Sequence, residues 1–177
     1  YEYRRIKEIA EKKPFIILPL NFPVNPDIND PYQALSYSTS ELKHWAMAPD
    51  NPATLIDHKV PIAITSSGLE EKDFRNNLSR AVDRGLSESD ALSALTTVPA
   101  MRMGLGEQLG KIQEGYIANL TITDGDIFNK KTNVLSTWVG GVEFPVKPKY
   151  AVDIRGHWSL TLQEDIYQLE LNKKSEK

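Results

Sequence analysis

Apolar positions in the first hundred residues alternate between continuous runs and helical spacing. Residues 15–20 (FIILPL) and 60–65 (VPIAIT) are short uninterrupted apolar runs, which are typical of buried parallel strands. Phe74 and Leu78 belong to a later run in which apolar residues recur every three or four positions, as in an amphipathic helix. This alternation predicts an α/β fold in which the two strands are parallel neighbours and a helix at 51–59 crosses between them.

Polar residues in front of the helical patterns predict where the helices begin. Ser40 precedes ELKHWAMA, and Ser87 precedes a second run in which Asp90 is spaced to complete a capping box. Pro99 is expected to open a further short helix, which Gly104 ends. The buried face of the run after Ser87 is expected to comprise Ala91, Leu92, Ala94 and Leu95.

Beyond residue 118 the pattern changes to two-residue alternation, which predicts strands. Gly140-Gly141 lies between two such segments and predicts a tight hairpin that pairs Val139 with Val142 and Thr137 with Phe144. With Leu120, the apolar members of this set are expected to close a small local core. A second hairpin of two half-buried strands is predicted around Glu164-Asp165. It needs a packing partner, because an isolated hairpin is only marginally stable.

Composition narrows the range of partners. Of 177 residues, 40% are hydrophobic, which is enough for one core or two small ones. The net charge is −3 and charges of both signs are interspersed, so no nucleic acid and no membrane is expected as a partner. Cysteine is absent. The chain opens within a helical pattern, without an initiator Met or a cap, and we expect it to be a piece of a longer polypeptide.

The order of residues from Ser87 to Asp126 resembles the carboxyl-terminal end of the amidohydrolase superfamily. There, a helix with the pattern EAL…AT…PA…LGL leads into GSLEPGKDADLVV, where the chain leaves a (β/α)8 barrel and enters a small β-sandwich. The matching positions are Asp90-Ala91-Leu92, Ala94, Thr96-Thr97, Pro99-Ala100, Gly104-Leu105-Gly106, Leu109-Gly110-Lys111-Ile112, Glu114-Gly115 and Ala118-Asn119-Leu120. Upstream, residues 15–22 and 51–68 resemble the seventh and eighth barrel strands of the imidazolonepropionase-like branch.

This resemblance implies an α/β fold that forms the C-terminal part of a (β/α)8 TIM-type barrel, followed by a small composite β-sandwich segment and a β-hairpin tail. Residues 1–105 would form the barrel portion, 106–148 the sandwich segment and 149–177 the hairpin tail or the start of a further module. The first partner implied is the remainder of the same polypeptide, which would supply the other strands. Two strands alone leave an open sheet, so the isolated chain is expected to self-associate or rearrange, with Phe15, Ile17, Ile62 and Ile64 as exposed apolar surface.

The resemblance also implies a metal-dependent hydrolase of C–N or related bonds. In that family the zinc-type divalent metal is held by residues of the first to sixth strands, which lie outside this chain. The eighth strand ends in an Asp that takes a proton from the attacking water. Here that position is Ser67, preceded by Ser66. A neutral hydroxyl is a poor metal ligand and a poor base. No metal site is therefore expected in this chain, and the chain alone is not expected to be catalytic.

Three interpretations of Ser67 remain open: a lapsed site, a site whose acid comes from Glu70 or Glu71, and a shifted register of the resemblance. Asn21, after the first strand, and Ser66 are the candidate substrate-binding residues. The three histidines, His44, His58 and His157, do not have metal-ligand spacing. Two functions are therefore compatible with the sequence: part of an active hydrolase, or a non-catalytic relative that kept the scaffold for binding or assembly.

Overall fold

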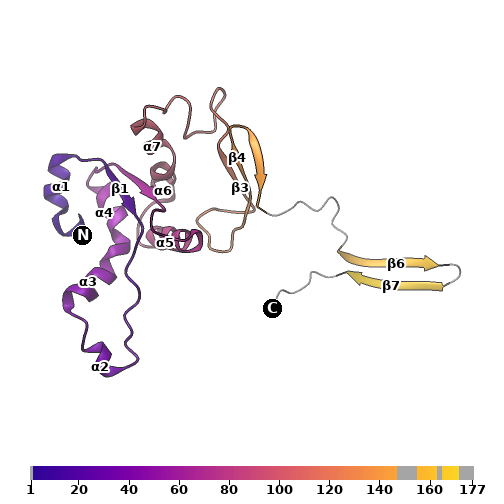
Figure 1. The fold of residues 1–177 in the computed structure, drawn as a ribbon, viewed down its shortest axis with the longest axis horizontal. Coiled ribbons are helices and arrows are strands. Elements are labelled where there is room, and N and C mark those ends of the chain that lie inside the picture. The colour runs from indigo at the N-terminus through magenta and orange to yellow at the C-terminus, as the bar shows by residue number, and fades with distance from the viewer. Residues whose placement is uncertain (1, 147–154, 163–164, 172–177) are drawn as a thin grey trace.

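The computed structural model describes residues 2–146, 155–162 and 165–171 (Figure 1). Two parallel strands and their helices form the first part, an antiparallel sheet follows, and a separate hairpin comes last. In chain order the elements are η1 (Glu2–Arg5), α1 (Ile6–Lys12), β1 (Ile16–Pro19), α2 (Pro31–Ala34), α3 (Thr39–Met47), η2 (Ala48–Asp50), α4 (Asn51–Asp57), β2 (Ile62–Thr65), α5 (Glu71–Asp83), α6 (Glu88–Leu95), α7 (Thr97–Arg102), β3 (Leu120–Thr123), β4 (Val134–Val139), β5 (Val142–Pro145), β6 (Gly156–Leu162) and β7 (Asp165–Leu171).

The strands β1 and β2 pair in parallel, in a register that places Ile16 opposite Ile62 and Pro19 opposite Thr65. This confirms the predicted parallel pair, with α4 between the two strands in the chain. The helix is shorter than expected, because it ends at Asp57, and His58 forms its C-cap. The longer connection after β1 protrudes from the body of the molecule and carries α2 at its far end (Figure 1).

The main core lies between the strand pair and the helices. Its buried members are Leu18, Leu20, Leu55, Val60, Ile62, Ile64, Leu78, Ala81, Leu86, Ala91 and Ala94. The expectation that Ile62 and Ile64 are exposed is wrong. The register places Ile64 beside Leu18, on the strand face that packs against the helices. The opposite face carries Ile17, which is 65% exposed as expected.

Helix α3 begins with a complete capping box, but not at the predicted residue. Ser38, rather than Ser40, is the N-cap, because it stands three residues before Glu41. The Glu41 amide donates to the Ser38 hydroxyl at 3.2 Å, and the Ser38 amide donates to the Glu41 carboxylate at 2.8 Å. Two backbone donors of the first turn are thereby satisfied.

Helix α6 begins after Ser87 as predicted, although its box is incomplete. The Asp90 amide donates to the Ser87 hydroxyl at 3.1 Å, while the Asp90 carboxylate accepts from that hydroxyl and not from the Ser87 backbone. Leu92 does not belong to the buried face, because it is 51% exposed. Small side chains, Ala91 and Ala94, make the close contact with the core instead. Helix α7 begins at Thr97, so Pro99 lies inside its first turn.

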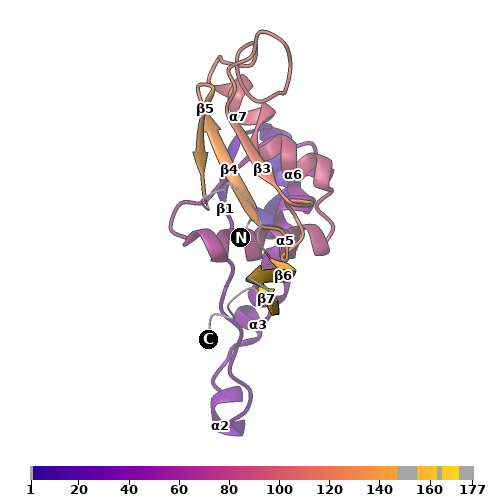
Figure 2. The same cartoon turned by 90° about the vertical axis from the view of Figure 1, so that its right-hand side faces the viewer.

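The sheet β3–β4–β5 is antiparallel, and Figure 2 shows its three strands as neighbouring arrows. The tight hairpin is confirmed, with Val139 opposite Val142 and Thr137 opposite Phe144. The expected local core is wrong, because Val139, Val142 and Phe144 are each more than half exposed. A three-stranded sheet has two faces, and no helix of the described part covers the one that carries these residues.

The last hairpin, β6–β7, pairs Trp158 with Leu169 and Leu160 with Tyr167 on one face. The prediction of half-buried strands is wrong, since every strand residue whose side chain is described is exposed. Asp165 is the first residue of β7, while Glu164 of the predicted turn lies outside the described residues. Among the helices described, none has the length and apolar character needed to cross a membrane.

Candidate functional site

The carboxyl ends of β1 and β2 meet at one edge of the sheet, because the strands are parallel and Pro19 lies opposite Thr65. Asn21 follows one strand and Ser66-Ser67 follow the other. In open and barrel-shaped α/β folds, ligands bind at the carboxyl ends of the strands. The structure therefore brings the three predicted site residues to the same end of the strand pair.

The turn after β2 is built by its own backbone. The Ser67 amide donates to the Thr65 hydroxyl at 3.2 Å, and the Leu69 amide donates to the Ser66 carbonyl at 3.0 Å. Gly68 then takes a φ of +77°, which a residue with a side chain adopts only at a cost. Ser66 and Ser67 are both exposed, so their hydroxyls face solvent.

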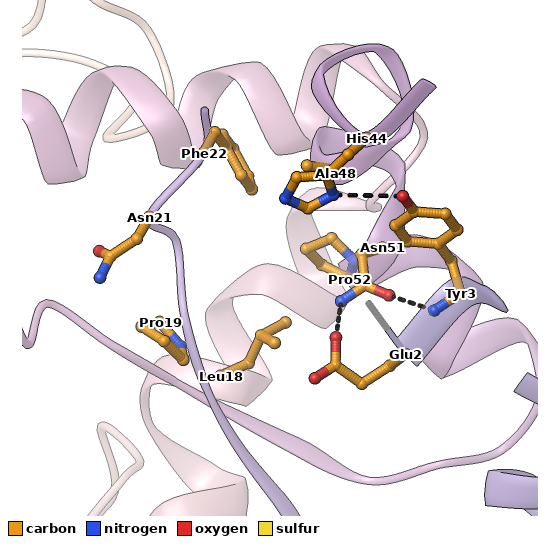
Figure 3. A pocket seen from close by; sticks show the side chains of 10 residues that line it. All are labelled: Glu2, Tyr3, Leu18, Pro19, Asn21, Phe22, His44, Ala48, Asn51 and Pro52. Atoms are coloured by element: carbon orange, nitrogen blue, oxygen red, sulfur yellow. Dashed lines mark hydrogen bonds between the residues drawn. The ribbon is translucent and has the colours of Figure 1, made fainter. Parts of the chain in front are cut away.

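Asn21 lies against this turn. A Cβ atom added at Gly68 would come within 3.2 Å of the Asn21 side-chain nitrogen, so the two segments approach closely. In Figure 3 the Asn21 amide points away from the neighbouring pocket. Helix α5 holds the backbone just before Asn21, because the side-chain amide of Asn77 donates to the carbonyl of Leu20 at 2.8 Å. Asn21 and the 66–68 turn thus form one polar surface.

Nothing in the described part supplies Ser67 with an acidic partner through a hydrogen bond. Glu70 is the N-cap residue of α5 and Glu71 lies in its first turn, and both are exposed. That Glu70 or Glu71 supplies the acid in place of the family aspartate therefore stays a prediction. The polar surface offers amide and hydroxyl groups, which can bind a substrate by hydrogen bonds but carry no charge at neutral pH.

A metal ion does not fit these residues. Zinc sites require thiolate, imidazole or carboxylate ligands, usually three or four together. Over the described ranges, no group of three or more His, Cys, Asp or Glu side chains could hold a metal ion. The histidines lie on separate elements: His44 on α3, His58 at the end of α4, where its Nδ1 contacts the Thr54 carbonyl at 2.9 Å, and His157 on β6.

A pocket of about 220 Å³ lies beside the site, and sequence patterns did not predict it. Asn51, which is 7% exposed, accepts from the Tyr3 amide at 3.0 Å and donates to the Glu2 carboxylate at 2.9 Å (Figure 3). The Tyr3 hydroxyl meets Nδ1 of His44 at 3.2 Å. Partial burial is the largest cause that lowers the pKa of His44, and the charge of Arg4 adds to it.

The residues of this pocket come from η1, β1 and the segment that follows it, α3, η2 and α4. Pro19 and Asn21 line it as well, so it borders the carboxyl ends of the strands. No motif connects Tyr3 with His44, which are 41 residues apart. Asn51 lies at the first position of α4 and is buried, so its amide needs partners for its donors and acceptor, but this burial is visible only in the structure.

Comparison with known proteins decides the family. The sequence model of the amidohydrolase family matches residues 53–144, which is just over half of the chain. This chain belongs to the amidohydrolase family. The matched range contains β2, the helices α5–α7 and the three-stranded sheet as far as Phe144, and therefore includes Ser66 and Ser67.

Individual amidohydrolases resemble this chain over part of their length. An amidohydrolase from Thermotoga maritima matches with a TM-score of 0.59 and 29% identity, over 81% of this chain and 35% of that protein. A second amidohydrolase structure matches with a TM-score of 0.56 and 16% identity, over 82% of this chain and 38% of the other. The amidohydrolase tasK of Hapsidospora irregularis is 35% identical over 57 residues, which are 32% of this chain and 6% of tasK. The chain thus spans little more than a third of the solved amidohydrolases.

Proposed function

We propose that this chain is the C-terminal portion of an amidohydrolase-type (β/α)8 barrel protein of the imidazolonepropionase-like branch. In this proposal residues 1–105 contribute the last two strands of the barrel, 106–148 belong to the composite sandwich, and 149–177 lie beyond it. The parallel pairing of β1 with β2 supports the barrel portion. The coverage of about a third of each solved amidohydrolase supports the proposed position within a longer polypeptide.

The proposed activity of the whole polypeptide class is metal-dependent hydrolysis of C–N or related bonds. This chain alone would not catalyse that reaction, because Ser67 replaces the strand-end aspartate and the other ligands would have to come from elsewhere. The observation that carries this proposal is the neutral polar surface of Asn21, Ser66 and Ser67 at the carboxyl ends of two parallel strands. Asn21 and Ser66 would contact the substrate when the remaining strands are present.

The first test uses the 177-residue chain. Zinc content is measured by elemental analysis after dialysis against zinc, and hydrolysis is assayed on N-acyl amino acids and dipeptides. We expect no stoichiometric zinc and no turnover. Tightly bound zinc near one equivalent, or a turnover that Ser67→Ala abolishes, would overturn the proposal.

A chimaera tests the role of position 67 directly. This chain replaces the corresponding carboxyl-terminal third of the Thermotoga maritima amidohydrolase, in one form with Ser67 and in a matched form with Ser67→Asp. Both forms are compared by circular dichroism and metal content before they are assayed. The proposal expects hydrolysis only from the Asp form. Equal activity of the two folded forms would show that Ser67 does not replace a required acid.

The second candidate function is a non-catalytic amidohydrolase-like module for binding or assembly. The absence of a carboxylate from the 66–68 turn favours it, together with the exposed apolar residues of β4 and β5. In the chimaera experiment this function predicts that neither folded form hydrolyses substrate, although the surface of Asn21 and Ser66 still binds substrate analogues.

A further inference from the structure

A second pocket, of about 370 Å³, lies between α5 and the loop that joins β3 to β4. Its volume falls near the lower end of the range of about 300–1,000 Å³ that is usual for small-molecule sites. It is lined by Glu71, Lys72, Arg75, Asn76 and Ser79 of α5 and by Lys130 of the loop. Positions 72, 75, 76 and 79 share one face of the helix, because they are spaced by three or four residues.

Two hydrogen bonds hold the walls of this pocket together. The Arg75 guanidinium donates to the carbonyl of Thr132 at 2.7 Å, and the Ser79 hydroxyl donates to the carbonyl of Phe128 at 2.5 Å. Thr132 is 7% exposed, so the loop is packed down rather than projecting into solvent. The pocket is therefore formed before any ligand enters, which lowers the entropic cost of binding.

The lining carries an excess of positive charge. Lys72, Arg75 and Lys130 oppose a single carboxylate, Glu71. Lys130 lies 4.0 Å from the Asp83 carboxylate, and both side chains are mostly exposed, so this pair is weak. Within the part of the chain that the structure describes, neither Lys72 nor Arg75 has a carboxylate within 4.0 Å.

The guanidinium of Arg75 is also incompletely satisfied. Its Nε is closed off from solvent and has no acceptor among the described residues. A buried donor of a charged group is unfavourable unless an opposite charge lies nearby. An anion in the pocket would stabilise the whole guanidinium through the Coulomb interaction, and Lys72 and Lys130 would face the same anion from the helix and from the loop.

We propose that this pocket binds a phosphate group, either as free phosphate or as part of a small phosphomonoester. Arg and Lys are the usual ligands of phosphate oxygens, and a fixed guanidinium with two mobile ammonium groups matches a doubly charged oxyanion. The pocket begins at the first turn of α5, whose partial positive charge favours an anion further. This site is separate from the surface of Asn21, Ser66 and Ser67.

The test is calorimetric titration of the 177-residue chain with inorganic phosphate, glycerol 3-phosphate and sulfate at constant ionic strength. Removal of one cationic contact is expected to weaken phosphate binding about five-fold, as in Lys72→Gln or Lys130→Gln. Lys131→Gln is the matched control, because it removes the same charge one position away and outside the lining. Glu71→Gln is expected to tighten binding, since it removes the one carboxylate of the lining.

The outcomes separate the sources of the phosphate group. Tighter binding of glycerol 3-phosphate than of phosphate identifies a phosphomonoester ligand, and equal affinities identify free phosphate. The proposal is overturned if neither inorganic phosphate nor glycerol 3-phosphate gives saturable heat. It is also overturned if Lys131→Gln weakens binding as much as Lys130→Gln, or if Glu71→Gln weakens it. Thermal unfolding of each variant excludes loss of structure as the cause.

Discussion

Replacement of Gly110 by alanine measures how tightly the Gly-rich segment after α7 packs against the helices. Gly110 has a φ of +88°, and a Cβ atom there would lie 2.8 Å from the carbonyl oxygen of Thr96 and 3.0 Å from the Cα of Thr97. Gly115, in the same segment, has a φ of +86°, but a Cβ atom there would have no neighbouring atom within 4 Å. The pair thus separates backbone strain from crowding.

The left-handed conformation costs a residue with a side chain about 1–2 kcal/mol, and this cost applies to both glycines. Crowding against backbone atoms, which cannot rotate away, adds about 1–3 kcal/mol at Gly110 alone. We therefore expect Gly115→Ala to lower the free energy of unfolding by about 1 kcal/mol and Gly110→Ala by about 3 kcal/mol.

The assay is urea unfolding followed by tryptophan fluorescence, with the wild-type chain and both variants measured under the same conditions. The informative quantity is the difference between the two variants, because strain common to both cancels. If Gly110→Ala and Gly115→Ala agree within about 0.5 kcal/mol, the segment does not pack against the 96–97 junction and the reasoning fails.

Three further predictions concern the core, pH and association. In the same urea assay, Leu55→Ala should lower the free energy of unfolding by about 3 kcal/mol, because Leu55 is fully buried. The control Leu35→Ala, at an 83% exposed position, should change the free energy of unfolding by less than about 0.5 kcal/mol. Two hydrogen bonds from Ser38, the larger effect coming from its hydroxyl and the smaller from its amide, lower the pKa of Glu41 in the folded state. The stability contributed by this carboxylate is therefore present above its ordinary pKa and is lost as the pH falls through the lower pKa of the folded state. The difference in unfolding midpoint between wild type and Glu41→Gln should therefore be largest near pH 7 and should narrow as the pH falls below the ordinary carboxylate pKa. A difference independent of pH would contradict this. The exposed apolar face of β6–β7 should make the chain associate at high concentration. Leu169→Ser should shift the mass measured by light scattering toward that of the monomer. A wild-type chain that stays monomeric at all concentrations would refute this expectation.

The parallel pair and the 140–141 hairpin could be predicted because each rests on a local pattern. Continuous apolar runs define β1 and β2, and a Gly-Gly turn fixes the register of β4 with β5. Burial was less predictable, since it depends on what covers a face. Ile17 and Ile64 are equally apolar, yet one is 65% exposed and the other 8%, because Ile64 joins the core beside Leu18 whereas Ile17 lies on the opposite face of β1.

The candidate site was predictable only in part. The positions of Asn21, Ser66 and Ser67 at one end of the strand pair follow from parallel pairing, although their roles stay predictions. The pocket of Tyr3, His44 and Asn51 could not be predicted, because it depends on contacts across more than forty residues. The cationic pocket had a partial signal in the spacing of Lys72 and Arg75, but nothing local indicated that Lys130 would face them.

The hydrogen bond between Leu20 and Asn77 has a consequence for the order of events during synthesis. The acceptor at the end of β1 leaves the ribosome 57 residues before its donor on α5. At about 5–20 residues per second, that interval lasts roughly 3–11 s. During this time the Leu20 carbonyl lacks its donor on α5, and the core that later buries Leu18 and Leu20 is incomplete. The nascent strand β1 therefore keeps an apolar face open to association with other extended apolar segments until α5 follows.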